Sequence, residues 1–168
     1  MKLNKPAHPE IVKMQICDIE PTLDILIEAG LESWKFCDFV SEIERKDSQV
    51  FVGKIKTQVV GFCVARLIRF QSTNPDFIDS TFYCKAECEI YNIAVKREFQ
   101  KREVGSRLLN RLISSLKQYN AESIWLEVRY SNQQAVNFYQ KQDFRRVYMR
   151  KNFYSNPVED AIVMKRNL

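Results

Sequence analysis

The residues best suited to chemistry lie in the second half of the chain. An apolar run at 89–95 precedes the basic sequence QKREVGS at 100–106, and a long amphipathic stretch follows. This order predicts a strand, a short loop and a helix, whose first backbone N–H groups and positive dipole end favour phosphate. Glu127, Asn132 and Tyr139 come downstream. The pattern predicts a phosphate-anchored cofactor site with an acid and a base beside it.

The loop lacks the patterns of two common phosphate-binding motifs. No Lys-Ser or Lys-Thr pair accompanies Gly105, and a dinucleotide fingerprint would need three glycines. The remaining pattern, Gln-x-Arg-x-x-Gly, is weak alone because basic residues near a helix start are usually just solvated. Glu127, Asn132 and Tyr139 also have ordinary explanations: a strand end, a helix cap and a packed ring. Their joint position after the loop favours a functional role.

Hydrophobic periodicity predicts the elements that position these residues. Apolar residues at helical spacing predict a helix over 104–119. Ser131 and Gln134 fit a capping box that begins another helix. The alternation of Val12, Met14 and Ile16 predicts a half-buried strand.

The rest of the chain completes the pattern. The other predicted elements are helices from Pro21 to Gly30 and over 36–43, a hairpin of 50–55 with 59–70, a loop over 71–79, and strands at 81–95, 123–128, 144–154 and 161–164. The order β-α-α-β-β-β-α-β-α-β-β predicts an α/β (α+β) three-layer domain, with a mixed sheet and helices on its faces.

Composition sets broad limits. We expect a single domain over 1–168, with 1–10 as a flexible tail. The net charge of +5 (26 Lys and Arg against 21 Asp and Glu) is too modest to indicate nucleic-acid binding. No apolar run approaches the ~20 residues of a membrane helix, and no secretory signal is present, so we expect no membrane association and a cytoplasmic location.

The cysteines do not indicate a metal site. Their odd number, five, favours free thiols. Cys84 and Cys88 are the one close pair, and the single histidine, His8, is far away in the sequence, whereas zinc needs about four ligands. We expect buried thiols on a strand and no metal.

The block from Tyr91 to Tyr139 resembles the acetyl-CoA core of the GNAT N-acetyltransferases, and most closely the bacterial ribosomal-protein-alanine N-acetyltransferases. The first half of the chain matches mainly in element order. The matching pieces are Asn92-Ile93-Ala94-Val95, Gln100-Lys101-Arg102, Gly105, Trp125 to Arg129, Ser131-Asn132, Tyr139, Phe144, Arg150 to Tyr154 and Glu159 to Met164. The resemblance implies a mostly antiparallel mixed sheet with helices on both faces. It also implies acetyl transfer from acetyl-CoA to the N-terminal amino group of a protein, for example a ribosomal protein.

The resemblance also assigns roles to residues. Glu127 would be the general base and Tyr139 the general acid, while Tyr154 and Trp34, in the loop around 32–36, would contact the acceptor. The stretch from Arg150 to Tyr154 would border the peptide site, although a plain structural strand explains it equally well. The implied cofactor-binding residues are Ile93, Ala94 and Val95 for the pantetheine arm, Lys101, Arg102, Glu103, Val104, Gly105 and Ser106 for the pyrophosphate, and Asn132 for the CoA arm.

These roles agree with the chemistry of amide formation. An α-amino group has a pKa of ~7.7–8.0 and must lose a proton before it attacks a thioester. A carboxylate can take that proton directly or through water, and a phenol can return one to the departing thiolate. A backbone N–H near Ile93 would stabilise the oxyanion.

Two residues depart from the family pattern. Glu103 and Asp143 stand where the family usually has glycine. We expect Glu103 to repel the pyrophosphate and to resist a positive φ, with Lys101 and Arg102 offsetting its charge.

Two other functions remain open. An acidic acceptor pocket would favour acetylation of a small amine, a polyamine or an antibiotic. Glu103 would suit a CoA-binding or interaction module without catalysis, whereas Glu127 and Tyr139 together argue against one. Nucleic-acid binding is a distant alternative, since no recognition motif is present.

Overall fold

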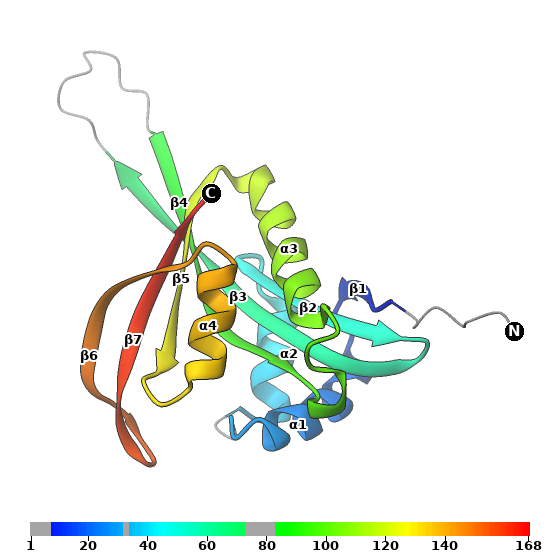
Figure 1. Cartoon of the computed structure of the whole chain (residues 1–168). Helices are drawn as coiled ribbons and strands as arrows, with labels where there is room; N and C mark the ends of the chain where they lie inside the picture. The colour runs from blue at the N-terminus through cyan, green and yellow to red at the C-terminus, as the bar shows by residue number, and fades with distance from the viewer. Residues whose placement is uncertain (1–7, 32–33, 73–82) are drawn as a thin grey trace, which may run out of the picture. The chain divides into compact units, whose positions relative to one another are not determined.

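The computed structural model of the chain (Figure 1) describes residues 8–31, 34–72 and 83–168. The strands are β1 (Glu10–Lys13), β2 (Ser48–Ile55), β3 (Gln58–Ser72), β4 (Tyr83–Val95), β5 (Ala121–Arg129), β6 (Arg145–Ser155) and β7 (Val158–Asn167). The helices are α1 (Ile19–Glu28), α2 (Phe36–Glu44), α3 (Val104–Leu116) and α4 (Gln133–Lys141), with short 3-10 helices at Ile16–Asp18, Arg97–Phe99 and Lys117–Tyr119. The predicted order of strands and α-helices is confirmed.

The seven strands hydrogen-bond in the order β1-β2-β3-β4-β5-β7-β6. β4 and β5 are parallel, whereas β1 with β2, β5 with β7 and β6 with β7 are antiparallel. The ladder between β4 and β5 ends at the pair Ile90–Leu126, five residues before the end of β4. This mixed, mostly antiparallel sheet with helices confirms the predicted α/β (α+β) fold.

The chain divides into two compact units, Met1–Ala65 with Asn92–Ser114 and Arg66–Tyr91 with Ser115–Leu168. The predicted phosphate loop belongs to the first unit. Glu127, Asn132, Tyr139 and Tyr154 belong to the second.

In the first unit, α1 and α2 cover one face of the strands (Figure 1). Val52 of β2 and Phe62 of β3 are buried in a cluster with Leu26 of α1 and Phe39 of α2. The rings of Phe39 and Phe62 meet edge to face, with centroids 5.7 Å apart. This cluster fixes the two helices on that face.

The opposite face of the same strands carries α3. Gly53 and Gly61 are the sequence neighbours of Val52 and Phe62. A side chain at either glycine would therefore lie on the other face of the sheet. A Cβ at Gly61 would lie 2.9 Å from the Ala94 carbonyl oxygen and 3.1 Å from Val104 Cγ1. Glycine at this position therefore lets α3 pack closely beside the end of β4.

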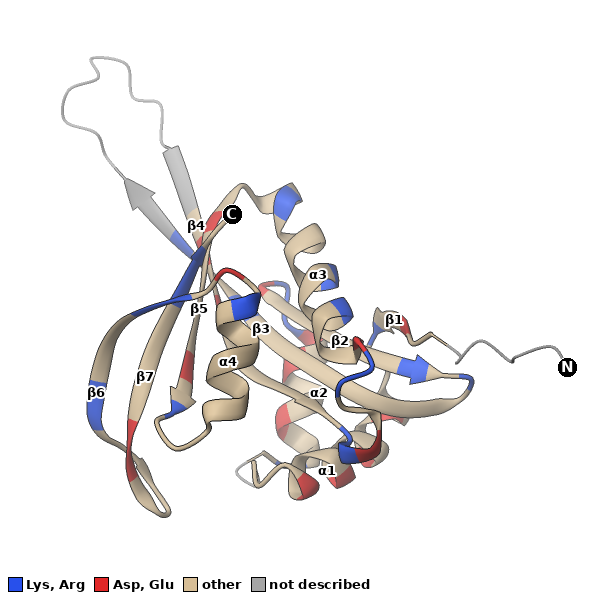
Figure 2. Ribbon diagram, viewed as in Figure 1, with Lys and Arg blue, Asp and Glu red and all other residues tan. Residues whose placement is uncertain are grey.

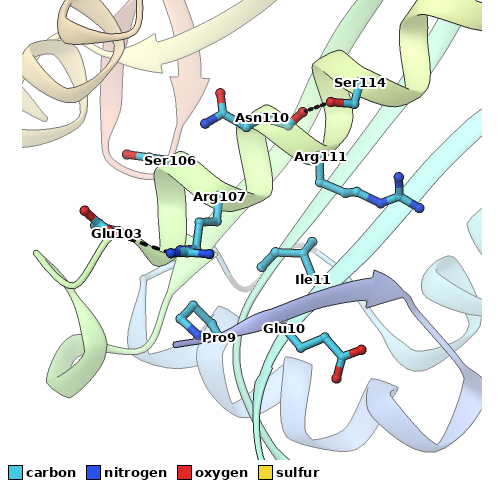
Figure 3. Close-up of a pocket in the computed structure, with 9 residues that line it drawn as sticks. All are labelled: Pro9, Glu10, Ile11, Glu103, Ser106, Arg107, Asn110, Arg111 and Ser114. Atoms are coloured by element: carbon cyan, nitrogen blue, oxygen red, sulfur yellow. Dashed lines mark hydrogen bonds and ion pairs between the residues drawn. The ribbon is translucent and has the colours of Figure 1, made fainter. Parts of the chain in front are cut away.

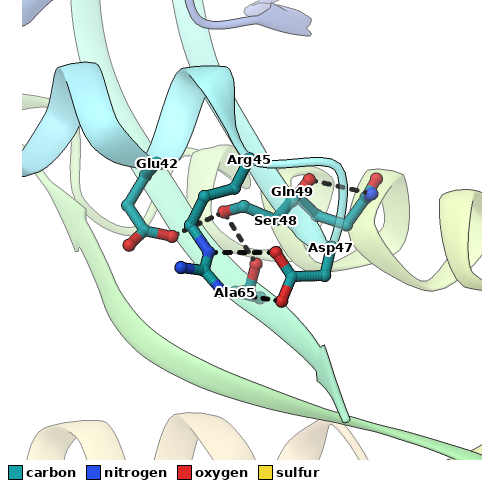
Figure 4. Close-up of polar contacts among 6 residues, drawn as sticks. All are labelled: Glu42, Arg45, Asp47, Ser48, Gln49 and Ala65. Carbon is teal, nitrogen blue, oxygen red and sulfur yellow. Dashed lines mark hydrogen bonds and ion pairs between the residues drawn. The ribbon is translucent and has the colours of Figure 1, made fainter. Parts of the chain in front are cut away.

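A buried polar group closes the connection between α2 and β2 (Figure 4). Ser48 donates to the Glu42 carboxylate at 2.8 Å and lies 3.3 Å from the Ala65 carbonyl oxygen. Arg45 and Asp47 pair beside it through two hydrogen bonds of 2.8 and 2.9 Å. Glu42 thus has a partner, as a buried carboxylate requires.

Three local predictions need correction. β1 ends at Lys13, and Ile16 lies in a 3-10 helix with 57% of its surface exposed, because the chain turns into α1 instead of continuing the alternation. Gln71 and Ser72 belong to β3, and residues 73–79 of the predicted loop lie outside the described residues. Asn132 is the N-cap of α4 in place of Ser131, and its side chain accepts from Ala135 N–H at 3.1 Å.

The structure describes only part of the expected flexible tail over 1–10. Residues 1–7 of the expected tail lie outside the described residues, whereas Pro9 is buried and Glu10 begins β1.

Candidate active site

The first unit builds the predicted phosphate loop between the end of β4 and α3. Lys96 N–H donates to the Val60 carbonyl at 2.9 Å, and the Gln100 side chain donates to the Val95 carbonyl at 3.1 Å. The Arg102 guanidinium carbon lies 5.5 Å from the centre of the Phe99 ring. These contacts tie the loop to β3 and to the end of β4.

Two loop residues adopt the left-handed conformation. Lys101 has a φ of 60° and Glu103 a φ of 63°, with Arg102 between them. Such local alternation turns successive backbone N–H groups toward one point and makes a concave anion site. Glu103 therefore adopts the positive φ that the family's usual glycine would adopt without a steric cost. Asp143, the second departure, likewise has a φ of 64°.

α3 begins directly after Glu103. The first bond of the helix runs from Arg107 N–H to the Glu103 carbonyl at 2.9 Å. The preceding N–H groups of a helix have no partner in its own hydrogen-bond ladder, so the helix start at Val104 and Gly105 is of the kind that binds phosphate. Figure 2 shows a blue basic stretch in the loop that leads into this helix start. Backbone donors and cations thus combine at the predicted site.

Ile93, Ala94 and Val95 are the last three residues of β4, directly before the loop. Ala94 is buried in the cluster that α1 and α2 form with the strands, and Ile93 and Val95 are half-buried. Trp34, the predicted acceptor contact in this unit, packs on Phe39 with ring centres 5.3 Å apart. Residues 32 and 33 of its loop lie outside the described residues.

In the second unit, Glu127 lies on β5 and forms an ion pair with Arg150 of β6. The Glu127 side chain is 21% exposed. The Arg150 guanidinium also lies over the Phe153 ring, 4.2 Å from its centre. Glu127 is therefore a partly buried carboxylate and not a fully exposed strand end.

Tyr154 lies in the same cluster. Burial and the nearby negative charge of Glu127 raise the pKa of its phenol to about 12. The Arg129 guanidinium stacks 4.1 Å from the centre of the ring. Tyr154 therefore keeps its proton throughout the neutral range and can donate a hydrogen bond.

A second carboxylate orders the loop before α4. Glu159 accepts from Ser131 N–H at 2.5 Å and pairs with Arg129 at 3.2 Å. The Ser131 N–H bond is the main reason that the pKa of Glu159 lies below its usual value. Glu159 thus fixes Ser131, the residue before Asn132. The side-chain oxygen of Asn132 itself accepts the capping hydrogen bond of α4.

Tyr139 projects from α4 into the core of the second unit. The residue is 8% exposed, and its ring centre lies 5.3 Å from that of Phe138 and 5.6 Å from that of Phe144. These contacts fix the ring in one orientation.

Sequence reasoning assigned no role to Arg129, and it considered Arg150 only as part of the stretch 150–154 that would border the peptide site. Both lie within stretches that match the family, Trp125 to Arg129 and Arg150 to Tyr154, so a signal was present. What was missing was the register of the strands. β6 carries a bulge, since Arg150 pairs with Ala161 whereas Tyr154 pairs with Glu159.

A pocket of about 710 Å³ lies on the side of α3 that faces β1 (Figure 3). It includes Glu103 and Ser106 of the predicted loop, but its other walls come from the start of β1 and the exposed side of α3. It is not the site predicted from sequence, because it contains none of the residues assigned to the pantetheine arm.

Other features concern the predicted thiols and metals. Cys63 and Cys88 are buried free thiols, and Cys17 and Cys37 are exposed free thiols. Within the described part of the chain, no three His, Cys, Asp or Glu side chains are arranged to hold a metal ion. No helix in those same ranges has the length and apolar character needed to span a bilayer.

The sequence matches the Acetyltransferase (GNAT) family over residues 19–144. The chain belongs to this family. This GNAT chain is an acetyl-CoA-dependent N-acetyltransferase, in agreement with the resemblance seen from sequence.

Two curated relatives of this GNAT chain illustrate the range of the family. The N-alpha-acetyltransferase of Sulfolobus acidocaldarius is 32% identical over 150 residues, 89% of this chain and 86% of the relative. The ribosomal protein bS18-alanine N-acetyltransferase of Haemophilus influenzae is 29% identical over 160 residues, 92% of this chain and 95% of the relative.

Two solved structures are similar in fold to this chain. The ribosomal-protein-S18-alanine N-acetyltransferase of Escherichia coli is 25% identical, with a TM-score of 0.74 over 95% of this chain and 93% of that one. NAA60 of Arabidopsis thaliana, in complex with a bisubstrate analogue, is 15% identical and has a TM-score of 0.82 over 95% of this chain and 99% of that one. The second likeness concerns the fold alone.

Proposed function

We propose that this GNAT enzyme acetylates the N-terminal α-amino group of a protein, with Glu127 as the general base and Tyr139 as the general acid. The observation that carries the proposal is the Glu127 cluster: a partly buried carboxylate on β5 beside a phenol, Tyr154, that stays protonated. Such a pair can accept a proton at one group and donate a hydrogen bond from the other.

The donor fits the loop of the first unit. The left-handed residues Lys101 and Glu103 and the start of α3 offer backbone donors suited to a pyrophosphate. Ile93, Ala94 and Val95 would hold the pantetheine arm by strand-like hydrogen bonds, and the amide of Asn132 would contact the same molecule. When bound, acetyl-CoA supplies a thioester that an amine can attack.

The residues of the second unit would handle the protons. Glu127 would take a proton from the incoming ammonium group, since an α-amino group with a pKa of ~7.7–8.0 is mostly protonated at neutral pH. Tyr139 would give its proton to the departing sulfur. Tyr154 would hydrogen-bond to the backbone of the acceptor, and Trp34 would contact its side chains.

The relatives support the choice of acceptor. One set is named N-alpha-acetyltransferase, and the other is named for N-acetylation of alanine in ribosomal protein bS18. A protein N-terminus of the ribosomal-protein-alanine type is therefore the acceptor that we propose.

The test is acetylation of matched peptides. Peptides that begin with alanine, serine or methionine would be incubated with acetyl-CoA, and released CoA thiol and the peptide mass would be followed. We expect turnover with the alanine peptide and none with the same sequence bearing a blocked N-terminus and an internal lysine.

The other outcomes identify the alternatives. Turnover with spermidine or the internal lysine, but not with a free N-terminus, would replace the proposal with a side-chain or small-amine acetyltransferase. Binding of acetyl-CoA without turnover of any acceptor in the panel would contradict the proposal and favour a CoA-binding module.

A further inference from the structure

We propose that Arg107 is a positioning residue for the acetyl donor: it holds the Glu103 carboxylate on the flank of α3, away from the N–H groups at the helix start. The inference rests on the proposed function, because it assigns those N–H groups to the donor pyrophosphate. It explains how the phosphate loop tolerates an acidic side chain.

The geometry of the pair supports this role. Arg107 Nη2 lies 3.6 Å from Glu103 Oε2, and the two residues are four apart, on the same side of one helical turn (Figure 3). The Glu103 side chain is 69% exposed, so burial does not restrict it. Without a partner, this carboxylate could turn toward the positive end of the helix, where negative charge is favoured. The same end is the place where a phosphate would bind.

The Arg107 side chain is itself held in place. Its Nη2 lies 3.3 Å from His8 Nδ1, which must accept because arginine only donates. Its guanidinium lies against the start of β1, where Pro9 and Ile11 line the same pocket (Figure 3). Arg107 Nε is buried and has no hydrogen-bond partner among the described residues.

That unsatisfied donor is informative. Leaving a buried N–H without a partner costs free energy, so the orientation must be maintained by other interactions. Two polar contacts of Nη2, with Glu103 Oε2 and with His8 Nδ1, stabilise the orientation of this guanidinium. Arg107 is therefore oriented toward the Glu103 carboxylate.

Arg111 provides a matched control. It lies one turn further along the same side of α3 and lines the same pocket, but its guanidinium stacks over the Phe51 ring, 5.3 Å from the centre. Replacing Arg111 removes the same charge from the same helix without releasing Glu103.

The experiment is a double-mutant cycle on CoA binding, measured by calorimetry. We expect Arg107→Gln to raise the Kd for CoA about fivefold when Glu103 is present, and about twofold or less in the Glu103→Gln background. Arg111→Gln should raise it about twofold or less in both backgrounds. Glu103→Gly, which removes both the carboxylate and the left-handed side chain, should tighten CoA binding and abolish the effect of Arg107→Gln.

Two further readouts separate positioning from stability. The KM for acetyl-CoA should rise in Arg107→Gln while kcat and the KM of the acceptor stay constant, and Arg107→Lys should restore part of the affinity. The coupling between positions 103 and 107 should shrink at high salt, since both side chains are exposed to solvent.

An equal loss of CoA affinity in both Glu103 backgrounds, or a loss that follows the melting temperature, would overturn the inference. Weaker CoA binding by Glu103→Gly would do the same, because the carboxylate would then assist the donor. Absence of CoA binding by the unmodified protein would instead refute the proposed function.

Discussion

Glu127 combines an ion pair within the sheet with a proposed chemical role. Its ion pair with Arg150 joins β5 to β6, two strands that are separated in the sheet by β7. The pair gives the carboxylate a defined direction, which a general base needs if it is to meet an incoming amine. Its energetic contribution to folding is expected to be small, because the Arg150 side chain is half exposed.

Replacement of Glu127 by Gln tests its proposed role as the base. We expect kcat/KM at pH 7 to fall by roughly 10²-fold or more, the usual contribution of a general base. The loss should be smaller at pH 9, where more of the α-amino group is already deprotonated. The measurement is acetylation of an alanine-first peptide across this pH range, with CoA affinity measured in parallel.

Glu122→Gln is the matched control for that experiment. Glu122 lies on the same strand and is exposed, so its replacement removes an equal charge without touching the cluster. An unchanged rate for Glu127→Gln at pH 7 would remove Glu127 from the mechanism.

At the scale of an element, the start of α4 combines a cap with a proposed donor contact. Asn132 caps the helix through its side-chain oxygen, whereas its amide NH₂ is the group that we propose for the CoA arm. Glu159 fixes the preceding residue, Ser131, from β7. The helix cap and the proposed donor contact therefore use different atoms of the Asn132 side chain.

Two substitutions at position 132 separate these functions. Asn132→Ala should lower the free energy of unfolding by about 1 kcal/mol through loss of the cap and should also weaken CoA binding. Asn132→Asp keeps the capping oxygen, so it should retain stability and lose CoA affinity alone. Urea denaturation and calorimetry check the two effects, and equal CoA affinity in all three proteins would exclude the amide contact.

At the scale of the whole molecule, the buried thiol of Cys88 links stability to alkaline pH. Burial in β4, with a smaller effect of Glu89, raises the pKa of this thiol from 9.0 to about 12. Between these values the folded protein binds more protons than the unfolded chain. The free energy of unfolding should therefore be unaffected by Cys88 below pH 9 and fall as the pH rises toward 12.

Cys88→Ala tests this linkage. The fall in unfolding free energy from pH 8 to pH 10 should be about 1 kcal/mol smaller in the variant than in the unmodified protein. Urea denaturation at the two pH values measures it, and the slope with pH, unlike the absolute stability, is insensitive to the small cavity that alanine leaves. Parallel slopes would show that ionisation of Cys88 is not linked to unfolding.

Much of the fold follows from local patterns in the sequence. The helical spacing of apolar residues predicted α3, and five of them are buried as expected: Val104, Leu108, Leu109, Leu112 and Leu116. The turn between β2 and β3 and the left-handed end of α1 at Gly30 also follow from residues close in sequence. Local prediction failed where two neighbours competed, as Ser131 and Asn132 did for the cap of α4.

The sequence by itself determined the family, the order of the elements and the position of the loop between β4 and α3, because those depend on periodicity and on motifs of a few residues. Only the tertiary structure decided the partners of the charged side chains. Arg150 meets Glu127 across 23 positions, and Arg107 meets His8 across 99. Such pairs depend on strand register, on the bulge in β6 and on how a helix packs against a strand, and these are set by the packing of the core, which no short stretch of sequence specifies.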